Sequence, residues 1–204
     1  MAKTKNIIFD LGGVLLNLDI QKTVDAFKQL GLNNTEELFR VGYAASFFKQ
    51  HETGSINDEE FIASIEKLTG SSGKQQQITE AWNALLLDFP PERIQWLQGL
   101  KNSYRLFLFS NTNAIHLNRF QETFYTSHGF AMDELFEKTY YSHLVRVRKP
   151  DIKAYEMVLN ENNLEASQTI FIDDALVNVE SAESIGIHGI HLKPGVSITS
   201  IVFD

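Results

Sequence analysis

Cysteine is absent from the 204-residue sequence. Its absence excludes a disulfide framework, a thiolate metal site and a cysteine nucleophile, and it fits a reducing, cytoplasmic location. Long apolar runs are absent as well, since none approaches the ~18 residues that cross a bilayer. The first apolar segment reaches Asp10 after three residues, which is too soon for a secretory signal. We therefore expect a cytoplasmic protein without a membrane partner.

Positive charge is scarce, because 18 Lys and Arg oppose 26 Asp and Glu and leave a net charge of -8. This acidic balance argues against a nucleic-acid partner, whose phosphates select basic surfaces, and its simplest effect is solubility. The hydrophobic fraction of 43% and the charged fraction of 22% are ordinary for a globular protein. The length suits one domain with an inserted subdomain. We expect a monomer or a small homo-oligomer.

Short apolar segments predict the β-strands. They lie at residues 6–9, 106–109, 139–141, 169–172 and, more weakly, 187–192. Continuous apolar strands are typical of a parallel sheet that helices cover on both faces. Helical spacing alternates with these strands from about residue 92 onward. The pattern predicts an α/β fold with a Rossmann-like, doubly wound parallel sheet.

The segment between the first two strands has a helical pattern instead. Apolar residues recur at helical spacing before Gly31, Asn57 and Glu60 fit a capping box, and Pro90 with Pro91 ends the last helix. We expect an α/β core at residues 1–18 and 91–204 and an all-helical subdomain at residues 19–90. The connections at about 16–20 and 88–91 are the expected hinges.

Polar side chains follow three of the strands, namely Asp10, Ser110 with Asn111, and Asp173 with Asp174. Ligands of open α/β sheets bind at the carboxyl ends of the strands. Three carboxylates gathered there are costly without a cation, and an all-oxygen ligand set favours Mg²⁺. The arrangement predicts a phosphoryl site, in which an aspartate attacks phosphorus and water hydrolyses the aspartyl-phosphate.

Lys149, just before Pro150, could pair with the nucleophile or with a substrate anion. Each of these features also has a simpler interpretation. An aspartate after a strand is commonly a turn residue or a helix cap, and a lysine in a loop is commonly solvated. The combination carries the functional prediction.

Four segments together resemble the motifs of the haloacid dehalogenase superfamily. They are residues 9–14 around Asp10, 108–111 ending in Ser110 and Asn111, 148–151 around Lys149, and 171–174 ending in Asp173 and Asp174, with Asn178 four residues further on. The helical insertion resembles that family's C1-type cap. The resemblance implies that Asp10 is the nucleophile and a Mg²⁺ ligand. The Gly12 carbonyl, Asp173 and Asp174 complete the implied metal ligands.

The same resemblance implies that Ser110 and the backbone amide of Asn111 bind the phosphoryl oxygens, while Lys149 steadies Asp10. Most phosphatases of the superfamily have a second aspartate as general acid and base, where this chain has Gly12. Such catalysis contributes ~10²–10⁴-fold, so a catalytically weak protein that binds phosphorylated ligands stays an alternative. Candidates for a replacement acid are Asp19, His51, Glu52 and His116.

A branch of the superfamily similar to α-D-glucose-1-phosphate phosphatase shares two further patterns. They are residues 110–113, Ser-Asn-Thr-Asn, and residues 51–54, His-Glu-Thr-Gly. The resemblance implies a small phosphorylated metabolite, with a sugar phosphate as the hypothesis for its class and with His51 and Glu52 as substrate-binding candidates. A solvated surface turn is the alternative for these two residues. A metal-independent 2-haloacid dehalogenase is the other enzymatic alternative, and the pair Asp173 and Asp174 argues against it.

Overall fold

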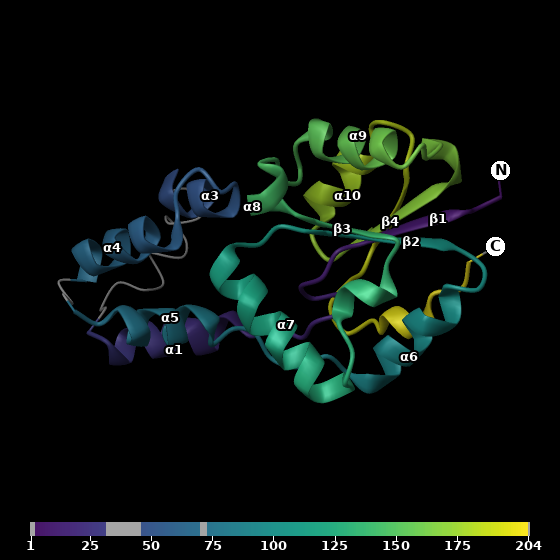
Figure 1. Cartoon of the computed structure of the whole chain (residues 1–204). Helices are drawn as coiled ribbons and strands as arrows, with labels where there is room; N and C mark the ends of the chain where they lie inside the picture. The colour runs from purple at the N-terminus through teal and green to yellow at the C-terminus, as the bar shows by residue number, and fades with distance from the viewer. Residues whose placement is uncertain (1–2, 32–45, 70–72, 204) are drawn as a thin grey trace.

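Five parallel strands form one sheet in a computed structural model that describes residues 3–31, 46–69 and 73–203. The strand order is β3-β2-β1-β4-β5 (Figure 1). The strands are β1 (Asn6–Phe9), β2 (Arg105–Ser110), β3 (Lys138–Tyr141), β4 (Thr169–Asp173) and β5 (His188–His191). All five predicted strands are confirmed, and with them the α/β fold class.

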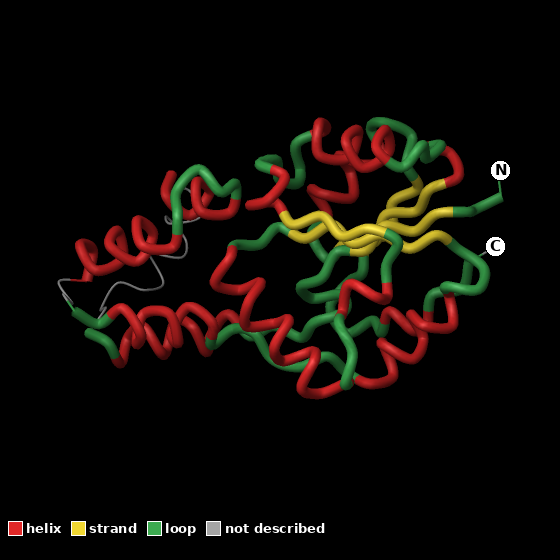
Figure 2. Tube along the Cα trace, viewed as in Figure 1, coloured by secondary structure: helices red, strands yellow, loops and turns green. Residues whose placement is uncertain are grey.

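Helices cover both faces of the sheet (Figures 1 and 2). On one face lie α6 (Pro91–Leu100), α7 (Ala114–His128), η1 (Met132–Leu135) and η3 (Ile198–Ser200), and on the other α8 (Ser142–Val145), α9 (Ile152–Glu161), η2 (Ala166–Gln168) and α10 (Leu176–Glu183). Ile7 and Phe9 of β1 pack into the first layer, whereas Ile8 packs into the second. This alternation follows from the two-residue period of a strand and explains why β1 is apolar at every position.

The strand register sets the position of the polar residues. Phe9 at the end of β1 lies level with Leu108 of β2 and Ile172 of β4. The residues that follow these positions emerge at the same edge of the sheet. Asp10 therefore lies between the carboxyl ends of its two neighbouring strands.

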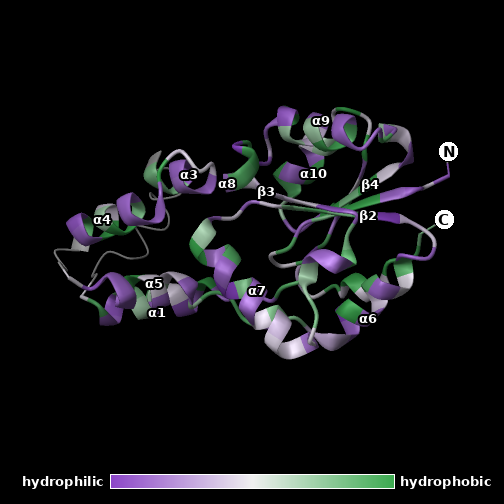
Figure 3. Ribbon diagram, viewed as in Figure 1, coloured by the Kyte–Doolittle hydropathy of each residue, from purple (hydrophilic) through white to green (hydrophobic). Residues whose placement is uncertain are grey.

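The helices that the structure describes between β1 and α6 form a second cluster, which we call the cap. They are α1 (Ile20–Gln29), α3 (Ser46–Glu52), α4 (Asp58–Thr69) and α5 (Gln75–Asn83). Figure 3 shows hydrophilic and hydrophobic residues side by side on these helices. Their apolar residues meet around Phe61, which is fully buried against Phe48 and Trp82. The cap lies beyond the carboxyl ends of the strands (Figure 1).

The two connections to the cap run side by side. The Asn17 amide donates to the Asp88 carbonyl at 2.9 Å, and the Asp19 amide donates to the Leu85 carbonyl at 2.9 Å. These contacts fall at or near the expected hinges. No helix in the described ranges is long and apolar enough to cross a membrane.

Local capping explains where several helices begin. The predicted capping box before α4 is confirmed, since the Asn57 amide donates to Glu60 at 3.0 Å and the Glu60 amide donates to Asn57 at 2.9 Å. Helix α9 begins at Ile152, because the Asp151 carboxylate caps it by accepting from the Lys153 amide.

The separate apolar cluster of the cap leads to a first prediction. Replacing Phe61 by Ala should destabilise the cap by about 3–5 kcal/mol, because the large fully buried ring leaves a cavity. Hydrogen exchange should show lost protection in α4 and α5, with β1 and β2 still protected. Phe61→Leu is the control and should cost less than about 1.5 kcal/mol. Equal loss of protection in the cap and the sheet would contradict a separate cap cluster.

Candidate active site

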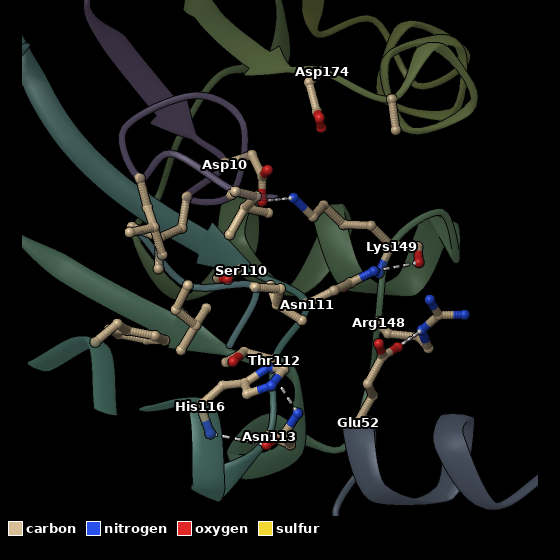
Figure 4. Close-up of a pocket in the computed structure, with 18 of the residues that line it drawn as sticks. Asp10, Glu52, Ser110, Asn111, Thr112, Asn113, His116, Arg148, Lys149 and Asp174 are labelled. Atoms are coloured by element: carbon tan, nitrogen blue, oxygen red, sulfur yellow. Dashed lines mark hydrogen bonds and ion pairs between the residues drawn. The ribbon is translucent and has the colours of Figure 1, made fainter. Parts of the chain in front are cut away.

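The carboxyl edge of the sheet holds a buried ammonium group between two carboxylates. Lys149 Nζ donates to Asp10 Oδ1 at 2.6 Å and to Asp173 Oδ2 at 2.7 Å. Lys149 comes from the loop between α8 and α9 and is only 1% exposed. Figure 4 shows its side chain extended toward Asp10. The structure thus brings together three of the predicted site residues.

These opposite charges control protonation in the site. Burial alone would lower the pKa of Lys149, but the charges of Asp10 and Asp173 and their hydrogen bonds raise it above its usual range. Lys149 is therefore a cation. Burial raises the pKa of Asp10 to about 7, against the opposing charge of Lys149 and with added repulsion from Asp173 and Asp174. One lysine does not fully balance this group of acids.

The three acids fit a divalent cation. Asp10, Asp173 and Asp174 each offer a carboxylate oxygen, and these oxygens lie within 4.8 Å of one another. Burial and the charge of Asp173 raise the pKa of Asp174 as well, so a cation would relieve a real repulsion. Oxygen donors of this kind suit Mg²⁺. Gly12 lines the adjacent cavity, and the metal-binding role of its carbonyl stays a prediction.

Gly13 provides the space for one of these acids. Its φ of 72° lies in the left-handed region that favours glycine. A Cβ atom at this position would lie 2.4 Å from Asp174 Oδ2. The carboxylate of Asp174 therefore approaches the backbone after β1 only because residue 13 has no side chain.

Asp173 is held rigidly by its neighbours. Asn178 Nδ2 lies 3.0 Å from each carboxylate oxygen of Asp173, and the Ala175 amide donates to Asp173 Oδ1 at 2.8 Å. The hydroxyl of Tyr155 in turn donates to the Asn178 carbonyl at 2.8 Å. Sequence reasoning missed Tyr155, because it follows the helical spacing of α9 like any other core residue.

Ser110 is the last residue of β2 and Asn111 is the next residue, so both lie at the carboxyl edge of the sheet. Ser110 is buried and lines the cavity beside Asp10. The side chain of Asn111 makes two hydrogen bonds with Lys149, since its Nδ2 donates to the Lys149 carbonyl and its Oδ1 accepts from the Lys149 amide, both at 2.9 Å. The motif resemblance implies a role for the backbone amide of Asn111, and it does not predict these contacts of the side chain.

A cavity of about 320 Å³ lies between this edge and the cap. Its reactive end includes Asp10, Ser110, Lys149, Asp174 and Asn178, and its other walls include Leu16, Leu18, Trp82, Leu85, Leu86 and Phe120. Such a concave, partly apolar pocket with a few convergent polar groups is typical of a small-molecule site.

Glu52 and His51 have different surroundings, although they are adjacent in the chain. Glu52 lines the cavity and forms an ion pair with Arg148, with 3.0 Å between Oε2 and Nε (Figure 4). Burial raises the pKa of Glu52, while Arg148 opposes that shift. His51 instead points its Nε2 toward Asp58 Oδ1 at 2.7 Å and stacks on Phe61. It is not among the residues that line the cavity, so it departs from the expected contact with substrate.

His116 lines the cavity but is engaged within the protein. Its Nε2 lies 3.0 Å from the Trp82 carbonyl, and its Nδ1 lies 3.2 Å from Asn113 Nδ2. Burial lowers the pKa of His116 to about 4. A neutral ring with both nitrogens occupied is a poor proton donor. Asp19 accepts from the Gln21 amide as the cap of α1, away from the lining of the cavity.

Leu18 covers Gly12, the position where the resemblance described above led us to expect a second aspartate. A Cβ atom at Gly12 would lie 2.7 Å from Leu18 Cδ1. A side chain there would require Leu18 to move. Of the candidate replacement acids, Glu52 is the one carboxyl that lines the cavity in the part of the chain that the structure describes.

Comparison with known proteins identifies the class to which this fold and site belong. Residues 4–186 match the family of haloacid dehalogenase-like hydrolases. The chain therefore belongs to this family, and the resemblance seen in its motifs is confirmed at that level.

Two curated relatives are phosphatases. The chain is similar to a D-ribitol-5-phosphate phosphatase of Bacteroides thetaiotaomicron, with 26% identity over 89% of this chain and 88% of the relative. It is also similar to a sesquiterpene phosphatase of Aspergillus oryzae, with 29% identity over 95% and 92% of the two chains. A HAD family enzyme of Bacteroides thetaiotaomicron, solved with magnesium and inorganic phosphate, superposes with a TM-score of 0.89, 34% identity and 96% and 97% coverage.

The contact between Gly13 and Asp174 leads to a prediction about metal binding. Gly13→Ala should weaken Mg²⁺ binding by about tenfold or more, because the new methyl group displaces the Asp174 carboxylate. Isothermal titration with Mg²⁺ measures the effect. Gly129→Ala is the matched control, since Gly129 has a similar φ of 79° but an added methyl group would meet nothing within 4 Å. Equal loss of affinity in both variants would show that Asp174 does not need the space at Gly13.

The low pKa of His116 predicts a pH-dependent stability. Between pH 6.5 and about 4 the unfolded chain binds a proton at His116 that the folded chain does not. Stability is therefore lost as the pH falls through this window, by about 3 kcal/mol at most. In urea unfolding, the free energy of unfolding of His116→Gln should fall between pH 7 and 4 by that much less than the free energy of unfolding of the native chain. His188→Gln, at an exposed position, is the control. Parallel losses in all three chains would refute the prediction.

Proposed function

We propose that this chain is a Mg²⁺-dependent phosphatase that hydrolyses a small phosphorylated metabolite through an aspartyl-phosphate. The observation that carries the proposal is the position of Asp10, which lies beside a buried lysine and two further carboxylates at one end of the cavity. Phosphatase relatives support the same chemistry. The absence of cysteine fits a cytoplasmic location for the enzyme.

Each residue of the site has a separate role in the proposed reaction. The Ser110 hydroxyl and the backbone amide of Asn111 bind phosphoryl oxygens, while Lys149 orients Asp10 and offsets negative charge. An oxygen of Asp10 attacks phosphorus as the P–O bond to the substrate breaks, and the leaving alkoxide takes a proton from water. A second water then hydrolyses the aspartyl-phosphate, which releases inorganic phosphate and restores the Asp10 carboxylate. A Mg²⁺ ion held by Asp10, Asp174, the Gly12 carbonyl and Asp173 would neutralise charge on the phosphoryl group.

The cap contributes the part of the cavity that receives the leaving group. We assign a substrate contact to Glu52, which Arg148 holds at the cavity wall. One relative is a D-ribitol-5-phosphate phosphatase and the other a sesquiterpene phosphatase. Because these leaving groups differ so much, the relatives do not select one leaving group for this chain. A glucose 1-phosphate-like substrate stays a prediction. Its anomeric leaving group would suit a site in which Gly12 replaces an acid.

The nucleophile and the metal are tested by two independent measurements. Asp10→Asn should reduce phosphate release by more than about a thousandfold, because the amide is not a nucleophile. A chelator should abolish release by the native chain, and added Mg²⁺ should restore it. Asp25→Asn, on the exposed face of α1, is the matched control and should leave activity intact.

A panel of sugar phosphates, polyol phosphates and p-nitrophenyl phosphate serves as substrate. Undiminished activity of Asp10→Asn would overturn the proposal. Binding of these compounds without turnover by the native chain would favour the phospho-ligand-binding alternative. Halide release from a 2-haloacid without Mg²⁺ would favour the dehalogenase.

A further inference from the structure

The side chain of Asn111, a residue that lines the cavity, pairs with one residue of a distant loop. Its amide nitrogen donates to the Lys149 carbonyl, and its oxygen accepts from the Lys149 amide, each at 2.9 Å. The two residues lie 38 positions apart in the sequence. An asparagine amide offers one donor side and one acceptor side, so Asn111 satisfies both backbone groups of Lys149 at once.

Two hydrogen bonds of the Asn111 side chain attach the loop around Lys149 to the end of β2. Pro150 follows Lys149 and has no backbone N–H to donate. Helix α9 begins only at Ile152. Asn111, by contrast, directly follows the last residue of β2, and β2 pairs with strands on both sides. The side chain of Asn111 thus ties the backbone of Lys149 to the rigid centre of the fold.

The position of that backbone determines where the ammonium group lies. Lys149 Nζ must reach Asp10 at 2.6 Å and Asp173 at 2.7 Å from the far end of a four-carbon chain. A displacement of about 1 Å at a reacting group can cost about 10²-fold in rate. We propose that the side chain of Asn111 is a positioning residue, which acts through Lys149 to orient Asp10.

This inference rests on the proposed phosphatase function, but it concerns only the contact between the Asn111 side chain and the Lys149 backbone. Asn111→Ala keeps the backbone amide that is assigned to the phosphoryl oxygens and removes only the pairing with Lys149. We expect kcat to fall by about 10²-fold, with KM changed by less than about threefold. Asn118→Ala, on the exposed side of α7, is the matched control and should retain native kcat and KM.

A double-mutant cycle with Lys149→Met distinguishes positioning from a general structural effect. If Asn111 acts through Lys149, then adding Asn111→Ala to Lys149→Met should cause little further loss of single-turnover rate. Additive losses, or a rise in KM with unchanged kcat, would overturn the inference. Thermal unfolding checks that each variant folds. Asn111→Asp, which keeps the acceptor for the Lys149 amide, replaces the alanine variant in the cycle if that variant does not fold.

The outcomes separate this inference from the proposed function. No phosphate release by the native chain with Mg²⁺ would overturn the phosphatase and the positioning role together. Phosphate release by the native chain combined with additive losses would overturn only the role of Asn111.

Discussion

The ion pairs of Lys149 are the interaction on which the site depends. Two carboxylates and an ammonium group are buried together, and removing charged groups from water is costly unless each finds close partners. The sheet supplies those partners, because β1 and β4 are neighbours and end at the same edge. Asn111 and Asn178 then fix Lys149 and Asp173 from either side. The remaining negative charge makes the site suited to a cation and to the anion that a cation attracts.

The cap forms the far wall of the cavity at this edge of the sheet. Its two connections pair with each other, so the chain leaves and rejoins the core at one place. Small residues allow the close contacts that result. Gly54, at a φ of 63°, lies so near the His143 carbonyl of α8 that a side chain could not fit. The ion pair of Glu52 with Arg148 adds a contact between cap and core next to the reactive lysine.

Sequence reasoning was strong where a local pattern has one physical solution. The apolar segments could only be buried strands, and Asn57 with Glu60 could be recognised as a helix start from their spacing. It was weaker for residues whose partners are distant in the chain. His51 and Glu52 are neighbours with the same apparent role, yet one pairs with Asp58 inside the cap and the other faces the cavity. Helical geometry separates adjacent side chains by about a quarter of a turn, and only packing decides which of them faces the site.

The sequence by itself determined the sheet, the helical insertion and the acids at the strand ends, because strand and helix periodicity and turn chemistry are local properties. Tertiary structure decided how these acids are used. It placed Lys149 between Asp10 and Asp173, turned the Asn111 side chain toward the lysine backbone, and engaged both nitrogens of His116. Apart from the contact of His116 with Asn113, three residues away, these are contacts between segments far apart in the chain. Their geometry follows from strand order and packing, which no short stretch of sequence contains.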